Sequence, residues 1–177
     1  MTAQIADTFI YNGEQYSLIG LRGEELIIPE QFGMEPTMMH TACYCGFYST
    51  YEIKDKKLIL QNMTVLENNN NYLPINGVEP VIDEYGVYNN IGLHVSFTGK
   101  LRLAKDFIQE YYIHMGYQKA TAFETVIDFT IKDGVVEVIN DRSKEVAEKR
   151  GAFKEKYEGS DIIERIEDAF SLDLDIE

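Results

Sequence analysis

The chain has few of the residues on which metal centres and disulfide frameworks depend. Among its 177 residues there is no tryptophan, and there are two cysteines, three histidines and four prolines. Two cysteines exclude a disulfide-rich scaffold, which needs several bridges. Cys43 and Cys45 lie two positions apart in a predicted strand, where closing so small a ring is strained. We therefore expect no structural disulfide between them.

Targeting and membrane segments are also missing from the pattern. The first residues, 1–7, have neither the basic start nor the apolar stretch of a secretory signal. No run approaches the ~20 apolar residues that a membrane-spanning helix needs. We expect a cytoplasmic protein without membrane partners.

Positive charge is scarce. Sixteen Lys and Arg residues face 30 Asp and Glu residues, which gives a net charge of −14. Half of that charge lies in residues 158–177, where eight acidic side chains stand against Arg165 alone. Such a field repels nucleic acid and attracts a basic protein. We therefore exclude nucleic acid and expect a basic protein partner, the alternative being that the charge only maintains solubility.

The most informative pattern that is present is a pair of blocks that occur twice in the same order. Residues 26–32 (LIIPEQF) resemble residues 101–107 (LRLAKDF), 75 positions later. Residues 51–55 (YEIKD) resemble residues 129–133 (FTIKD), 78 positions later. Because order and spacing are both kept, we interpret the blocks as an internal duplication.

The duplication divides the chain into four parts. Repeat one covers about 8–66, an Asn-rich linker about 67–84, and repeat two about 85–142. These three parts form one duplicated β domain, and residues 143–177 form an acidic helical extension. Apolar residues make up 45% of the chain and charged residues 26%, which is typical of a folded globular domain.

Strand signals dominate both repeats. Asn12-Gly13 between apolar runs predicts a hairpin, residues 26–28 and 41–53 read as strands, and residues 123–131 alternate in polarity. We predict a mainly β, α+β fold of about eight antiparallel strands, forming a closed barrel or a two-sheet sandwich.

One helix is expected inside repeat two. Over residues 104–115, apolar side chains recur at helical spacing, and Gly116 follows at the position of a C-terminal cap. The C-terminal region predicts a further amphipathic helix, with an apolar stripe that either docks on the domain or contacts a partner or a second subunit. Its partner-binding candidates are Glu164, Glu167, Asp168 and Phe170.

The closest approach to a metal motif is His40-x-x-Cys43-x-Cys45. Structural zinc sites usually have four ligands, and the second pair is missing, so we expect no metal and no cofactor. His114 lies at roughly the repeat-equivalent position of His40. Twelve tyrosines, several near the junctions of the repeats, suit either a core or a binding surface. The ligand-binding candidates are His40, Cys43, Tyr44, Tyr111 and His114.

Catalytic signatures are weak. There is no Gly-x-Ser-x-Gly elbow and no phosphate-binding loop, so whether the protein is an enzyme is left uncertain, leaning towards none. We hypothesise a non-enzymatic cytoplasmic binding protein that recognises a basic protein partner, with an inhibitor or immunity-type role among the options. The alternative is a small-molecule-binding barrel with a cavity lined by Tyr and Met. An unrecognised enzyme would require His40, His114 and a cysteine or carboxylate to converge in one cleft.

Overall fold

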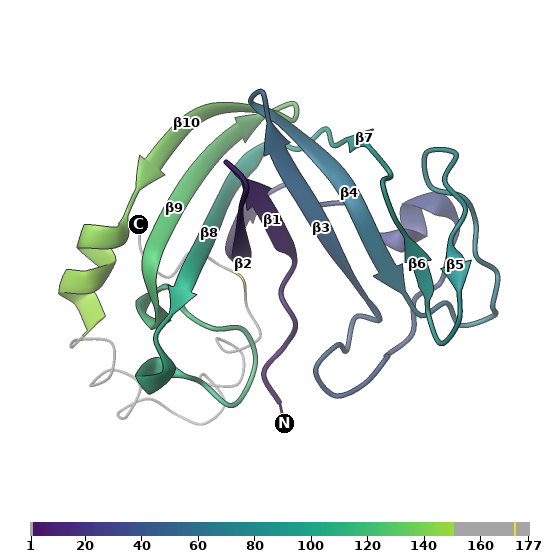
Figure 1. Cartoon of the computed structure of the whole chain (residues 1–177), viewed down its shortest axis with the longest axis horizontal. Helices are drawn as coiled ribbons and strands as arrows, with labels where there is room; N and C mark the ends of the chain where they lie inside the picture. Colours follow the sequence, from purple (N-terminus) through teal and green to yellow (C-terminus); the bar gives the residue numbers. More distant parts are fainter. Residues whose placement is uncertain (1, 151–171, 173–177) are drawn as a thin grey trace.

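The computed structural model describes residues 2–150 and residue 172, and ten strands organise this part of the chain (Figure 1). The strands are β1 (Thr8–Tyr11), β2 (Glu14–Gly23), β3 (Phe47–Lys54), β4 (Lys57–Val65), β5 (Val81–Ile82), β6 (Gly86–Tyr88), β7 (Leu93–His94), β8 (Gly99–Phe107), β9 (Phe123–Lys132) and β10 (Val135–Asp141). Short 3-10 turns are η1 (Pro29–Phe32), η2 (Gln109–Tyr111) and η3 (Ala120–Ala122), and residues 143–150 are α-helical. No helix in the described part of the chain is long and apolar enough to cross a membrane.

A closed barrel is the central feature, so the predicted barrel is confirmed. Neighbouring strands follow the order β10-β9-β8-β2-β1-β3-β4, and β4 pairs back to β10 through Val135 and Lys57. The amide of Leu58 donates to the Gly134 carbonyl at 2.9 Å at this seam, and the amide of Val136 donates to the Lys56 carbonyl at 2.7 Å. Strands β5, β6 and β7 extend the sheet beyond β4. Closure pairs backbone N–H and C=O groups that would be exposed at the edges of an open sheet.

The predicted hairpins form where left-handed residues allow a tight turn. Asn12 and Gly13 have φ of 51° and 76°, which suits the turn between β1 and β2. Asp133 and Gly134, with φ of 48° and 77°, turn β9 into β10 in the same way. One pairing departs from the antiparallel prediction, because β1 runs parallel to β3.

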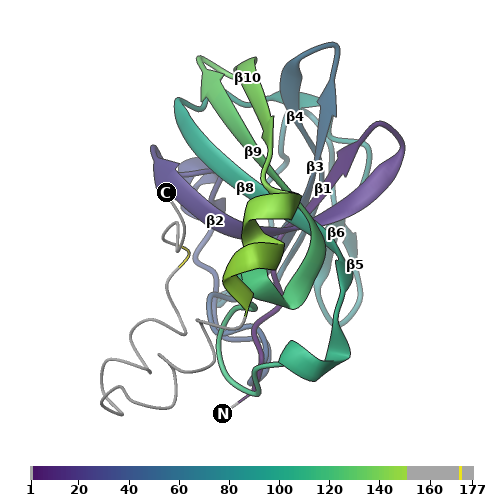
Figure 2. The same ribbon diagram turned by 90° about the vertical axis from the view of Figure 1, so that its left-hand side faces the viewer.

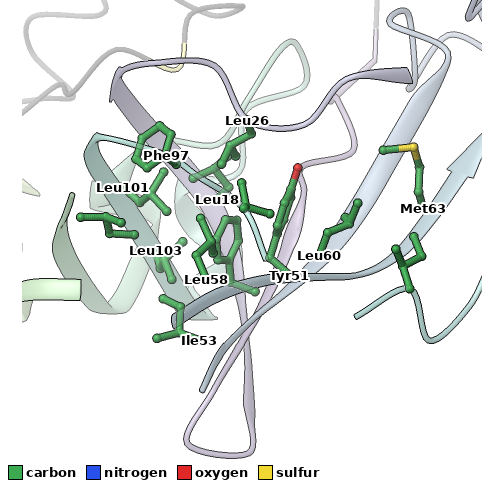
Figure 3. Packing of buried hydrophobic residues seen from close by; sticks show 14 of the residues in the cluster. Leu18, Leu26, Tyr51, Ile53, Leu58, Leu60, Met63, Phe97, Leu101 and Leu103 are labelled. Carbon is green, nitrogen blue, oxygen red and sulfur yellow. The ribbon is translucent and has the colours of Figure 1, made fainter. Parts of the chain in front are cut away.

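Apolar side chains fill the interior of the barrel (Figure 3). The rings of Phe9 and Tyr51 stack with centroids 4.9 Å apart, and both residues are fully buried. They pack with leucines from opposite walls, among them Leu58 on β4 and Leu101 on β8. Burial of this apolar surface is the main force that holds the barrel together.

A second apolar cluster lies where β2, β8 and β9 meet the helix of residues 143–150 (Figure 2). Val146 of the helix is fully buried against Ala104 and Val126. Arg102 on β8, only 1% exposed, donates two hydrogen bonds to Asp128 on β9, at 2.6 and 2.8 Å, and Arg142 adds a third at 3.0 Å. The charges are therefore buried as a paired group rather than singly.

The structure supports only one of the two repeated blocks as a structural equivalence. Residues 51–55 and 129–133 both lead a long strand into a hairpin. Residues 101–107 lie in β8, whereas residues 26–32 form a loop followed by η1, so the predicted strand at 26–28 is wrong. The fold thus bears out the barrel without the duplication.

The helix predicted at residues 104–115 is also wrong. Ala104 to Phe107 continue β8, which is paired on one side with β2 and on the other with β9. Asp106 has a φ of 60°, which a helix interior does not accept, and only η2 has a helical turn. Pairing along both edges of β8 outweighs a spacing that resembles a helix.

One strand boundary differs from the prediction, and one residue of the expected linker makes specific contacts. The strand predicted for 41–53 begins at Phe47, because residues 41–46 form turns. The Asn-rich stretch expected as a linker is anchored by Glu67, whose carboxylate accepts backbone hydrogen bonds from Asn69 and Asn71 at 2.8 and 2.6 Å. Burial opposes ionisation of Glu67, but the backbone amides of Asn71, Glu35 and Asn69 outweigh it and lower its pKa.

Candidate functional site

One end of the barrel gathers loops around the N-terminal segment, on the side opposite the β3–β4 and β9–β10 hairpins (Figure 1). The amide of Gln4 donates to the Gly116 carbonyl at 2.8 Å, and the amide of Ile5 donates to the Ala42 carbonyl at 2.8 Å. Gln4 also accepts a hydrogen bond from the Tyr44 amide at 3.3 Å. Residues 3–5 therefore connect the loop that contains His40 to the loop that contains His114.

Three of the predicted ligand-binding residues lie together in the turn of residues 40–46. The Cys43 amide donates to the His40 carbonyl at 2.9 Å, and the His40 ring nitrogen Nδ1 accepts from the Ala42 amide at 3.3 Å. His40 is exposed, Cys43 is buried, and Tyr44 is 44% exposed. The three residues therefore belong to one turn but differ in their exposure to solvent.

The other two predicted residues belong to different surroundings. Tyr111 packs against the second apolar cluster, next to η3. His114 is exposed, and its ring meets the Tyr112 ring edge-on with centroids 4.8 Å apart. The partner-binding candidates of the C-terminal region, Glu164, Glu167, Asp168 and Phe170, lie outside the described residues.

Sequence reasoning missed the chemically most unusual residue of this end, Asp7. Burial raises the pKa of Asp7 to about 7, although the Ser49 amide donates to its Oδ1 at 2.7 Å, and the negative charge of Cys45 raises the pKa further. Ser49 is buried too, and its Oγ has no hydrogen-bond partner among the described residues. No local pattern marks Asp7, because its contact with Ser49 of β3 forms only in the folded chain.

The two sulfur atoms lie close to the same backbone carbonyl oxygen. The Sγ atoms of Cys43 and Cys45 lie 3.4 and 3.1 Å from the Phe47 carbonyl oxygen. A hydrogen bond from the Cys43 thiol lowers the pKa of Cys45 to about 6, against the opposing effect of burial. The same interaction and burial raise the pKa of Cys43. These opposite shifts favour ionisation of the exposed Cys45 over that of the buried Cys43.

Tyr117 completes this cluster. Burial raises the pKa of Tyr117 to about 12, and the nearby charges of Cys45 and Asp7 contribute in the same direction. We call Asp7, Cys43, Cys45, Ser49 and Tyr117 the thiol cluster. It combines a nucleophile, a carboxyl group that titrates near neutral pH and a protonated phenol. Within the described residues, no three His, Cys, Asp or Glu side chains are grouped so as to hold a metal ion.

A second surface lies at β5, the last strand in the sheet order (Figure 1). Val81 and Ile82 are 68% and 58% exposed, the most exposed large apolar side chains of the described residues. Glu79 precedes them and Asp83 and Glu84 follow, and all three carboxylates are exposed. We call residues 79–84 the acidic finger.

Comparisons with protein-family models, with curated proteins and with solved structures find no match for this chain.

Proposed function

We propose that the protein is a non-enzymatic binding protein that recognises a basic protein partner, and that the acidic finger is its principal described contact. The observation that carries the proposal is the apolar pair Val81 and Ile82 standing exposed between carboxylates. The cytoplasm is the compartment that we propose, in keeping with two cysteines that are both free thiols.

The apolar part of the finger supplies an anchor. Neighbouring side chains on a strand point to opposite faces, so a strand that packs on a core buries at least one of them. In β5 both Val81 and Ile82 remain more than half exposed. Burying such a side chain in a partner contributes about 1.5–3 kcal/mol. The pair therefore suits insertion into a shallow apolar pocket.

The acidic residues of the finger favour a partner whose apolar pocket has a basic rim. Glu79, Asp83 and Glu84 flank the apolar pair in sequence, so lysine or arginine at the rim of a partner's pocket would complement them. The net charge of −14 favours the same partner at long range. A second copy of this chain would bring like charges together, which disfavours self-association through the finger.

The acidic residues of the C-terminal region belong to the same proposal through their charge. Glu164, Glu167 and Asp168 add to the field that attracts a basic protein, and Phe170 adds an apolar side chain. An inhibitor or immunity-type protein, which covers a basic surface of another protein, is the particular role that this combination favours.

Capture from a lysate of the source organism tests the proposal. We expect the immobilised full chain to retain a lysine- or arginine-rich protein at low salt and to release it at high salt, because screening weakens exposed charge contacts. The double variant Val81→Ser/Ile82→Ser should lose it. The control Val138→Ser/Ile139→Ser changes two exposed apolar residues on β10 and should retain it. Equal capture by both variants would rule out the finger as the contact.

The small-molecule alternative finds little support. Side chains fill the barrel interior, whereas a ligand-binding barrel needs a cavity there. A hollow of about 250 Å³ lies beside the first residues of β2 and the last residues of β8, where Gln15, Tyr16, Lys105 and Phe107 contribute to its lining. It contains one tyrosine and no methionine, unlike the cavity that the sequence led us to expect.

A further inference from the structure

The thiol cluster divides two cysteines into an accessible and a protected partner. Cys45 is exposed, whereas Cys43 in the same turn is 2% exposed. Both sulfur atoms are within 3.4 Å of the same Phe47 carbonyl oxygen. A reagent from solution therefore meets Cys45 first, with a second sulfur close behind it.

A turn suits a bond between these sulfurs better than an extended strand does. Two positions along an extended strand span about 6.6 Å, near the upper limit of Cα separation for a disulfide. Residues 41–46 form turns instead, and Gly46 has a φ of 80°. A Cβ at Gly46 would lie 2.2 Å from the Thr37 carbonyl oxygen, so the turn can pack against Thr37 only with glycine at position 46.

We propose that Cys43 and Cys45 form a reversible dithiol–disulfide couple that hydroperoxides oxidise, with Cys45 as the attacking thiolate and Cys43 as the resolving thiol. This redox site is separate from the acidic finger. A disulfide in so small a ring is strained, and strained disulfides are readily reduced. Cellular thiols would therefore return the pair to its reduced state.

The oxidation takes two steps. The Cys45 thiolate attacks one oxygen of the hydroperoxide, an S–O bond forms, the O–O bond breaks, and the leaving alkoxide or hydroxide takes a proton from solvent. The Cys43 sulfur then attacks the Cys45 sulfenic acid. An S–S bond forms, the S–O bond breaks, and hydroxide leaves with the Cys43 proton as water. The net change is dithiol plus hydroperoxide to disulfide, alcohol or water, and one further water.

Several groups set the ionisation of Cys45. The Cys43 thiol stabilises the thiolate, and the negative charge of Glu30 on η1 opposes it. Asp7 from the N-terminal segment and Tyr117 from the loop before η3 both interact with the Cys45 charge. The hydrogen bond from Cys43 outweighs burial and Glu30, so the pKa of Cys45 is lowered overall. The thiolate is therefore populated at pH values where an ordinary cysteine is protonated.

Alkylation of the full chain with iodoacetamide at pH 6 tests the thiolate. Allowing for the lower nucleophilicity of an acidic thiol, Cys45 should react about ten-fold faster than the same cysteine in the chain unfolded by guanidinium. Cys43 in the folded chain should react far more slowly than Cys45. Equal rates for folded and unfolded Cys45 would overturn the assignment of the attacking thiol.

Hydrogen peroxide then tests the couple, with peptide masses as the readout. The full chain should lose two hydrogens to one intramolecular disulfide that dithiothreitol reverses. Cys45→Ser should form none, and Cys43→Ser should stop at a Cys45 sulfenic acid that dimedone traps. Cys43→Ala provides the same test if Ser disturbs the buried site. Disulfide-linked dimers, or Cys45 sulfinic acid with Cys43 still free in the unsubstituted chain, would overturn the proposal.

Discussion

Ionisation of Asp7 lowers the stability of the folded protein. Asp7 is half-buried at the end of the barrel, and its pKa rises from 3.8 to about 7, first because of burial. Well below pH 3.8 the carboxyl is protonated in both the folded and the unfolded chain, so it has no effect on the free energy of unfolding. Between pH 4 and 7 the unfolded chain releases the proton first, so stability falls as the pH rises. Above pH 7 the full cost is present.

We predict that Asp7→Asn stabilises the protein at pH 8 and not at pH 3.5. The asparagine side chain keeps an oxygen for the Ser49 amide but carries no charge. The rise in pKa from 3.8 to about 7 sets an upper bound of about 4 kcal/mol, and partial solvent exposure reduces our expectation to about 2 kcal/mol. Urea unfolding at both pH values measures it. Asp55→Asn, which changes an exposed hairpin acid, should give no such pH-dependent gain, and a gain equal to that of Asp7→Asn would contradict this account.

At this scale the sequence identified the cysteine pair but not its surroundings. The spacing of Cys43 and Cys45 is visible in the chain, and His40 next to it suggested a shared site. Asp7 and Tyr117 reach the thiols only through the fold, from segments far apart in sequence. His114, which the repeat pattern aligned with His40, instead contacts Tyr112. Local spacing carries no information about such long-range neighbours.

Among the elements, the seam between β4 and β10 decides whether the barrel closes. Gly134 occupies the turn beside this seam, with its carbonyl bonded to the Leu58 amide and its amide bonded to the Phe97 carbonyl at 2.9 Å. A Cβ at Gly134 would lie 2.1 Å from the Val95 carbonyl oxygen. The glycine is therefore needed for close approach of the backbone as well as for its positive φ.

We predict that Gly134→Ala destabilises the protein by about 2–4 kcal/mol, because the turn must move away from Val95 and strain the seam. Gly77→Ala is the matched control. Its φ of 76° is nearly the same as the 77° of Gly134, but nothing lies within 4 Å of its added Cβ. Strain alone should cost the control about 1 kcal/mol. Chemical denaturation of both variants measures the difference, and equal losses would show that the close approach is unimportant.

Elements with a strong local signal were predictable, and those fixed by pairing were not. The turns at Asn12-Gly13 and Asp133-Gly134 depend on residues that accept positive φ, which the sequence shows directly. Residues 104–107 continue a strand because β9 pairs with it as far as Phe107, while β2 pairs with it as far as Ala104. The resemblance between residues 26–32 and 101–107 likewise did not predict a shared structure.

For the whole molecule, the sequence predicted the architecture better than it predicted the position of the proposed binding surface. Alternating polarity and tight turns predicted a β barrel or a two-sheet sandwich, and the structure has the barrel. The acidic finger was assigned to the linker, since the segment around Pro80 showed only turn signals. Its prominence comes from the end of the sheet order, where β5 leaves both of its side chains exposed.

The most direct test of the binding proposal is photo-crosslinking from Val81 in cells of the source organism. A photoreactive phenylalanine analogue replaces Val81 in one sample and Val138 of β10 in the other, in the full chain. We predict that the Val81 position yields an adduct with a lysine- or arginine-rich protein, that the Val138 position does not, and that high salt in a lysate abolishes the adduct. Adducts of equal yield from both positions, or none from Val81, would contradict the proposal.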